Sequence, residues 1–174
     1  MIISQFNTTI DYWISSLNRY DLELLKTQPS TDSWSMGQLY KHLIDETGFF
    51  LEQAELCLKI GDNSNGEMTE EAQLMFAKNS FPDKKIKGDQ QVATNLPQPH
   101  TKEELRSGMM NLRVKGNTLW QKVERSSDKG KTKHPGLGYF NARQWLQYAE
   151  MHMRHHFSQK QRIEDVLEKQ KNTI

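Results

Sequence analysis

Apolar residues recur every three or four positions in four long stretches of the chain, the spacing that lines one face of an α-helix. This pattern predicts helices over residues 5–26, 35–61, 101–126 and 141–169. Pro29 ends the first of them, because a proline cannot continue a helix. Each predicted helix is polar on its other face, so each should pack one side against the rest of the protein.

Capping residues support these boundaries. A Ser, Thr or Asn before a helix, followed three positions later by Glu or Gln, can satisfy the free backbone N–H groups of the first turn. Three such pairs stand at the predicted starts: Ser35 with Gln38, Thr101 with Glu104, and Asn141 with Gln144.

The connections between these helices are unequal in length. Residues 27–34 form a short link, 62–100 form a long one with a predicted short helix over 69–77, and 127–140 are rich in Gly and Pro. Four amphipathic helices without an alternating β-strand pattern predict an all-α fold, a four-helix bundle that forms one domain over 1–174. The short-long-short order favours an up-down-down-up bundle, because a long link can join two helices that run the same way.

Charge and composition narrow the range of possible functions and partners. Basic and acidic residues nearly balance at a net charge of +1, so neither nucleic acid nor an acidic membrane surface is expected as a partner. No stretch approaches the roughly 20 apolar residues of a membrane helix, and the first residues lack the pattern of a signal peptide. The single cysteine, Cys57, excludes an intrachain disulfide. We therefore expect a cytoplasmic protein.

Residues 150–159 carry three of the six histidines. His152 and His156 are four positions apart, so on a helix they project from one face, one turn apart. His42 lies on the inner face of the second predicted helix. Facing helices of a bundle can hold a metal between them, and three imidazoles leave coordination positions open, as catalytic sites do. The sequence thus predicts a divalent metal site of His42, His152 and His156.

The histidines also admit other interpretations. A buried histidine is often satisfied by a hydrogen bond alone. His155 follows His152 by three positions, a spacing that can also bind metal, so it either competes with His156 or flanks the site. His100 and His134 fall in predicted connections and are expected to be solvated, although His134 could contact a substrate.

Glu46 follows His42 by one turn on the same predicted face. One interpretation is a catalytic carboxylate that orients a water molecule or a ligating histidine. The other is a carboxylate at the edge of the bundle that pairs with Arg154 or Arg162. Gln159 could hydrogen-bond the site or the neighbouring backbone.

Two motifs resemble a known family. Residues 34–43 read W-S-M-G-Q-L-Y-K-H-L, and residues 134–159 combine H-P-x-x-G with H-x-x-H-H-x-x-Q. Both are similar to motifs of the DinB-like family of metal-dependent enzymes, which includes the YfiT-type proteins. The resemblance implies an up-down-down-up bundle, often a homodimer, with zinc or nickel held by His42, His152 and His156. Some relatives use low-molecular-weight thiols, so the resemblance also implies a thiol co-substrate.

These features lead to competing hypotheses. The first is a metalloenzyme that hydrolyses a small molecule or transfers a thiol to it, with residues 62–100 and 127–140 as walls of the substrate pocket. The second is a non-catalytic stress-response or interaction protein whose buried histidines are structural. A metal store or sensor is a third, without a predicted partner surface. Since ligating imidazoles must be neutral, we expect metal affinity to fall below about pH 6.5.

Overall fold

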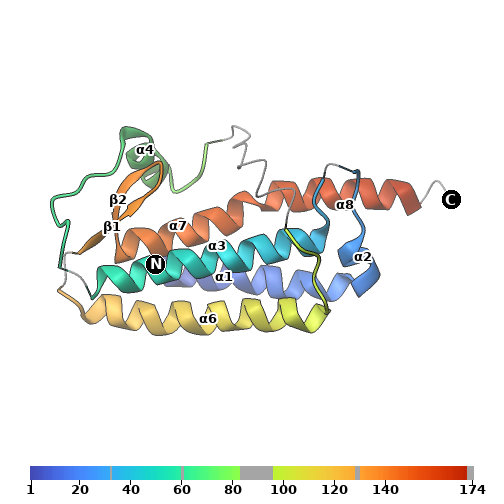
Figure 1. The fold of residues 1–174 in the computed structure, drawn as a ribbon, viewed down its shortest axis with the longest axis horizontal. Coiled ribbons are helices and arrows are strands. Elements are labelled where there is room, and N and C mark those ends of the chain that lie inside the picture. Colours follow the sequence, from blue (N-terminus) through green and yellow to red (C-terminus); the bar gives the residue numbers. More distant parts are fainter. Residues whose placement is uncertain (32, 60, 83–95, 128–129, 172–174) are drawn as a thin grey trace.

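The computed structural model describes residues 1–31, 33–59, 61–82, 96–127 and 130–171, and most of these residues are helical (Figure 1). The elements, in chain order, are α1 (Ile2–Ser16), the 3-10 helix η1 (Leu17–Arg19), α2 (Leu22–Lys26), α3 (Met36–Cys57), α4 (Glu70–Lys78), α6 (Lys102–Arg125), β1 (Lys131–His134), β2 (Gly138–Asn141), α7 (Ala142–His155) and α8 (Phe157–Lys171). Within the described ranges, no helix combines the length and apolar character needed to cross a membrane.

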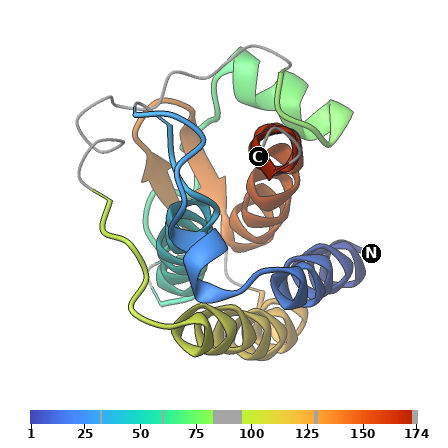
Figure 2. The ribbon, with the colours of Figure 1, turned by 90° about the vertical axis from the view of Figure 1, so that its right-hand side faces the viewer.

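Four long helical rods, α1, α3, α6 and the pair α7–α8, lie side by side (Figures 1 and 2). α3 packs against α6 and α7, and α1 packs against the same two helices. The chain colours in Figure 1 show that α1 and α7 run in one direction whereas α3 and α6 run in the other. The long connection between α3 and α6 contains α4, which packs against α7.

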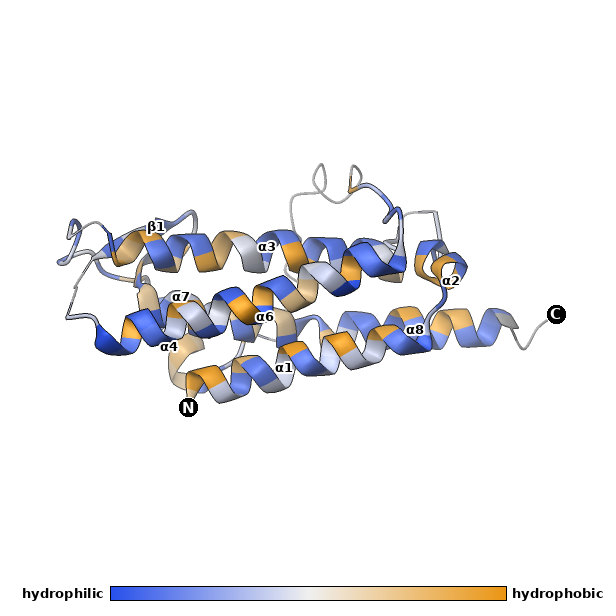
Figure 3. Ribbon diagram, turned by 90° about the horizontal axis from the view of Figure 1, so that it is seen from below, coloured by the Kyte–Doolittle hydropathy of each residue, from blue (hydrophilic) through white to orange (hydrophobic). Residues whose placement is uncertain are grey.

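The apolar faces of the rods meet in a shared core, while polar residues colour their other faces (Figure 3). Phe6, Ile10 and Trp13 of α1 are buried, as the spacing of apolar residues predicts. Trp120 of α6 and Trp145 of α7 are buried as well. Removal of these large apolar side chains from water is the main force that holds the rods together.

The prediction of one continuous helix over residues 5–26 is wrong. α1 gives way to η1, and Tyr20 then adopts an extended backbone (φ −117°, ψ 137°) before α2 begins. The side chain of Asp21 accepts a hydrogen bond from the N–H of Leu24 at 2.8 Å and so caps α2. Tyr20 is buried at this break, and its hydroxyl donates to Glu164 of α8. A cap and a tertiary contact thus interrupt a helix that apolar spacing alone would continue.

The last predicted helix, over residues 141–169, is interrupted as well. α7 and α8 meet at His156, which lies between them in the right-handed helical region (φ −75°, ψ −3°). The indole Nε1 of Trp13 donates to the carbonyl of Met153, in the last turn of α7, at 3.3 Å. A side chain that inserts at a helix carbonyl is a common cause of such an interruption. The apolar pattern continues through the break and therefore could not reveal it.

The connection before α7 contains a β-hairpin that the sequence analysis did not predict. β1 pairs antiparallel with β2, with Lys131 opposite Asn141 and His134 opposite Gly138. Gly138 has a φ of +82°, which favours glycine, and a side chain there would lie 2.5 Å from the carbonyl oxygen of Glu67. Each strand has four residues, too few for an alternating pattern to stand out. The all-α expectation therefore broadly fits a mostly helical fold, to which the structure adds a small two-stranded sheet.

The predicted helix starts are largely confirmed. Two complete capping boxes form, Ser35 with Gln38 and Asn141 with Gln144. Thr101 accepts from the N–H of Glu104, but the Glu104 carboxylate accepts from the N–H of His100, so that box is incomplete. The short helix predicted over residues 69–77 is present as α4. Local cap chemistry therefore identified where helices begin more reliably than where they end.

Candidate metal centre

Three imidazole rings meet between α3 and α7. His42 belongs to α3 and His152 to α7, and His156 lies between α7 and α8. The Nε2 atom of His156 lies 3.2 Å from Nε2 of His42 and 3.3 Å from Nε2 of His152. The three rings each offer one nitrogen within 4.8 Å of the others. Two ligands with bonds of about 2.0–2.1 Å to a tetrahedral ion lie roughly 3.3–3.4 Å apart, so these rings could hold one divalent ion.

The helices explain why the rings converge. α3 and α7 pack against each other along much of their length. His152 and His156 are one turn apart on the face of the last rod that meets α3. The helical conformation of His156 keeps its side chain in line with His152 despite the interruption between α7 and α8. The i, i+4 spacing found in the sequence therefore does place both rings on one face in the structure.

Burial keeps these rings uncharged. Removal from water lowers the pKa of His42 to about 4 and, together with the neighbouring His42, lowers the pKa of His156 to about 3. The pKa of His152 lies well below its ordinary value, first because of burial and then because of the other histidines. Neutral imidazoles present nitrogen lone pairs, which is the form that binds a metal. The electrostatics thus prepare all three rings as ligands at neutral pH.

A hydrogen bond at the far side of the His156 ring decides which of its nitrogens faces the other two rings. Nδ1 of His156 lies 2.8 Å from Oε1 of Gln159 and must donate to it, because a carbonyl oxygen only accepts. Nε2 of His156 therefore presents its lone pair to the other two rings. Nδ1 of His152 is buried without a hydrogen-bond partner among the described residues. A proton on Nδ1 of His152 would therefore have no acceptor, which costs free energy. An ion bound to Nε2 of His152 would offset this cost.

Aromatic rings surround the histidines. The ring centroid of Trp34 lies 4.9 Å from that of His42, and Phe50 lies 5.3 Å from His152. Phe81, from the connection after α4, lies 6.1 Å from His152. These rings cover part of the imidazoles and give the surroundings of the cluster an apolar character. Phe81 also places part of the long connection beside the cluster, as the pocket hypothesis requires; residues 83–95 of that connection lie outside the described part of the chain.

Glu46 lies one turn beyond His42 on α3 and is half-buried. Burial raises the pKa of its carboxyl group. The Glu46 carboxylate contributes, after burial, to the raised pKa of Tyr148 on α7. Arg154, one of the alternative partners for Glu46, binds the carboxylate of Glu150 instead.

The other histidines occupy different settings. His155 stacks on Phe81 at 5.2 Å between ring centroids and flanks the cluster. His100 is exposed, as expected for a residue in a connection. The expectation that His134 is solvated is wrong: it is half-buried at the end of β1, and its Nε2 lies 3.1 Å from the hydroxyl of Tyr148. The unpredicted hairpin is the reason, because it folds this loop back over α7.

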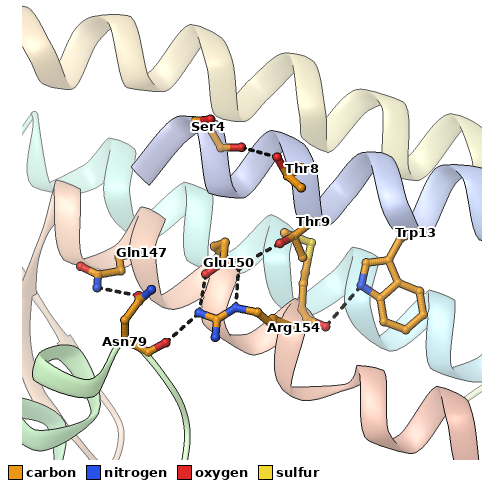
Figure 4. Close-up of polar contacts among 9 residues, drawn as sticks. Ser4, Thr8, Thr9, Trp13, Asn79, Gln147, Glu150 and Arg154 are labelled. Carbon is orange, nitrogen blue, oxygen red and sulfur yellow. Dashed lines mark hydrogen bonds and ion pairs between the residues drawn. The ribbon is translucent and has the colours of Figure 1, made fainter. Parts of the chain in front are cut away.

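An ion pair with a buried carboxylate fixes α7 beside the cluster (Figure 4). Nε and Nη2 of Arg154 each donate to the carboxylate of Glu150 at 2.9 Å. Glu150 also accepts from Thr9 of α1 at 2.8 Å, and Arg154 donates to the carbonyl of Asn79 after α4 at 2.7 Å. Figure 4 shows this pair bridging α1 and the turn that follows α4. The turn of α7 that carries His152 is thus held from two sides.

Comparison with known families adds an independent observation. Residues 5–159 match the DinB superfamily. The chain belongs to the DinB superfamily. The matched range begins in α1 and includes His42, His152 and His156, so the resemblance seen in the sequence motifs is confirmed. No curated protein and no solved structure gave a significant match.

For this DinB superfamily protein, sequence reasoning missed three contributors to the surroundings of the cluster. Phe81 lies in a polar connection without periodicity, so no pattern pointed to it. The contact of Trp34 with His42 was hidden because the tryptophan precedes the helix. The pairing of His134 with Tyr148 could have been suspected only from the H-P-x-x-G motif, which places that histidine just before α7.

Proposed function

We propose that this protein is a metal-dependent enzyme that acts on a small molecule, with a divalent ion, zinc or nickel, held by His42, His152 and His156. The observation that carries the proposal is that Nε2 of His156 lies 3.2 and 3.3 Å from Nε2 of His42 and His152, and that all three rings offer a nitrogen within 4.8 Å of the others. We further propose the up-down-down-up four-helix bundle as its architecture, supported by the directions of the rods in Figure 1.

When bound, a divalent ion supplies Lewis acidity, which polarises a substrate oxygen and eases the deprotonation of a water molecule or a thiol. The protein supplies position and apolar surroundings. Three imidazoles leave ligand positions open, and the rings of Trp34, Phe50 and Phe81 cover part of the cluster. A structural metal site would instead close all four positions with protein ligands.

In this proposal Glu46 is the general base. Its carboxylate follows the ligand His42 by one helical turn, and burial raises its pKa. A raised pKa makes a carboxylate a stronger base, better matched to removal of a proton near neutral pH. Glu46 would accept the proton of the nucleophile and return it to the leaving group.

Two reaction types fit these parts. In hydrolysis the nucleophile is water, and the substrate is an ester or an amide. In thiol transfer a low-molecular-weight thiol is the co-substrate and attacks an electrophile. Glu46 removes one proton in either reaction, and both need the same open side of the ion. We propose that the enzyme is cytoplasmic, because such thiols are available in the cytoplasm, and that it assembles as a homodimer.

The competing proposal is a non-catalytic bundle with structural histidines. It draws support from the geometry, because Nε2 of His156 could accept a hydrogen bond from Nε2–H of His42 or of His152 without any ion. Retention of metal separates the two proposals. Protein loaded with zinc or nickel and then dialysed should keep about one ion per chain, and the exposed-histidine control His100→Ala should keep the same amount. Absence of retained metal would overturn the enzyme proposal.

The reaction type requires a second experiment. Metal-loaded protein would be incubated with panels of esters, amides and pairs of a thiol with an electrophile, beside the Glu46→Gln variant loaded to the same metal content. Turnover that depends on both the metal and Glu46 would support the proposed mechanism. Equal turnover by Glu46→Gln would remove the role of general base from this residue.

A further inference from the structure

Tyr148 and His134 form a hydrogen-bonded pair beside the histidine cluster. Nε2 of His134 lies 3.1 Å from the hydroxyl oxygen of Tyr148. On the other side of the same ring, the backbone N–H of Gly136 donates to Nδ1 of His134 at 3.1 Å. The turn between β1 and β2 therefore holds one edge of the imidazole while the other edge meets the tyrosine.

This pattern determines where the hydrogen atoms lie. Nδ1 of His134 accepts from Gly136 and cannot carry a proton itself. A neutral imidazole has one N–H group, so the proton of His134 lies on Nε2, which donates to the oxygen of Tyr148. The hydroxyl hydrogen of Tyr148 is then left for a different acceptor. The hairpin thus turns a tyrosine into a directed hydrogen-bond donor.

The position of Tyr148 points to the acceptor. Tyr148 precedes His152 by one turn of α7, and Glu46 follows His42 by one turn of α3. Because α3 and α7 run in opposite directions, both steps lead to the same side of the cluster (Figure 1). Tyr148 contacts Phe50 and Phe81 at 5.0 and 5.1 Å between ring centroids, the two rings that also pack near His152. A molecule bound at the histidines on this side would lie beside Tyr148.

We propose that Tyr148 is a substrate-binding residue that donates a hydrogen bond to the carbonyl oxygen of a small molecule at the three-histidine site, and that His134 is its positioning residue. This inference rests on the proposed function. A carbonyl oxygen fits because it accepts without carrying a proton, and because a fixed donor stabilises the negative charge that an attacked carbonyl develops. The neighbouring Phe50 and Phe81 suit an apolar or aromatic group attached to that carbonyl.

Ligand binding tests the tyrosine without a turnover assay. Benzohydroxamate, which offers a carbonyl oxygen and an aromatic ring, would be titrated into cobalt-loaded protein while the visible absorption of the cobalt is followed. Tyr148→Phe keeps the ring and should weaken binding by about tenfold or more. Tyr139→Phe is the matched control, because Tyr139 of β2 packs against Gly66, in the connection between α3 and α4, and this variant should bind benzohydroxamate as tightly as the wild type.

A double-mutant cycle tests the positioning role of His134. His134→Phe retains an aromatic ring against Trp145 and Phe140 but loses the N–H group. It should weaken benzohydroxamate binding severalfold in the wild type, and it should have little further effect in Tyr148→Phe, because a positioning residue acts only through the group it positions. Equal effects of His134→Phe in both backgrounds would overturn the positioning role.

A metal-free measurement completes the test. Nitrogen NMR of the His134 ring should show a proton on Nε2 and none on Nδ1; the opposite tautomer would overturn the inference whatever the ligand results. Full cobalt content with unchanged benzohydroxamate affinity in Tyr148→Phe would overturn the inference while leaving the proposed function intact. Failure of the wild type to bind cobalt would overturn the proposed function and this inference with it.

Discussion

The Nε2 atoms of His42 and His156 lie 3.2 Å apart, although 114 positions separate the two residues in the chain. Neither ring carries a charge near neutral pH, since burial lowers the pKa of both. Two neutral imidazoles gain little from facing each other nitrogen to nitrogen, unless one donates to the other or both face a common ion. The role of this contact therefore depends on the third ring, His152, whose Nε2 also faces His156.

His152→Ala should abolish metal retention without unfolding the protein. The substitution removes one of three ligands and leaves a small cavity beside Phe50, so the free energy of unfolding should fall by about 0.5–3 kcal/mol. Metal content after dialysis and circular dichroism would measure the two effects. An unfolded chain would instead assign a structural role to His152, and full metal content would exclude it as a ligand.

Metal binding should resist acid more than free histidines would allow. The sequence alone suggests a loss of affinity below about pH 6.5. Burial, however, lowers the pKa of His42 to about 4 and that of His156 to about 3, so protons compete with the ion only in more acidic solution. We expect metal affinity at pH 5.5 to stay close to its value at pH 7.5 and to fall near about pH 4. A midpoint near 6.5 would show that the rings are solvated.

The same shifts make the stability of the metal-free protein depend on pH. In the unfolded chain these histidines take up protons below about pH 6.5, whereas the folded rings stay neutral until about 4 for His42 and about 3 for His156. The unfolded state therefore binds more protons, and the free energy of unfolding should decrease as the pH falls from 6.5. Urea titrations at pH 7 and pH 5.5 would measure this change. His42→Gln should show a smaller decrease.

The sequence predicted which histidines come together better than it predicted the shape of the chain around them. His152 and His156 share a face because the i, i+4 relation is local, and their neighbour His42 could be added because its helix has an unmistakable apolar face. The interruption at His156 was invisible, since it depends on Trp13 reaching the carbonyl of Met153 from a different helix. Contacts between distant segments leave no trace in a local pattern.

The hairpin, and the contact that it creates, could not be predicted from the sequence for a related reason. Strands of four residues show too little alternation to be recognised. Without the hairpin, His134 could be treated only as a loop residue, and its contact with Tyr148 could not be foreseen. Glu46, by contrast, was found by spacing alone, and its role as a base stays a prediction until the Glu46→Gln variant is measured.

Loss of Arg154 should destabilise the protein strongly. Its partner Glu150 has a side chain only 3% exposed, so Arg154→Met would leave a buried carboxylate without its ion pair, at a cost of about 3–5 kcal/mol. Arg113→Met is the control, because Arg113 pairs with Asp11 at the surface, where such pairs contribute about 0–1 kcal/mol. Chemical denaturation of both variants would give the difference. Equal effects would mean that the Glu150 pair contributes no more than a surface contact.

Gln159 should control the affinity of the site without touching the ion. Its Oε1 accepts from Nδ1 of His156 at 2.8 Å and so keeps the lone pair of Nε2 directed at His42 and His152. Gln159→Leu removes this acceptor, after which the His156 proton can move to Nε2 and block coordination. Loss of such a supporting hydrogen bond typically costs about 10–100-fold in metal affinity. Gln161→Leu is the control, because that amide donates to Asp165 on the exposed side of α8 and should leave the affinity unchanged. Competition of each variant with a chelator of known affinity would measure both values. A Gln159→Leu protein that binds metal as tightly as Gln161→Leu would show that other contacts fix the His156 ring, and the tautomer argument for this site would have to be abandoned.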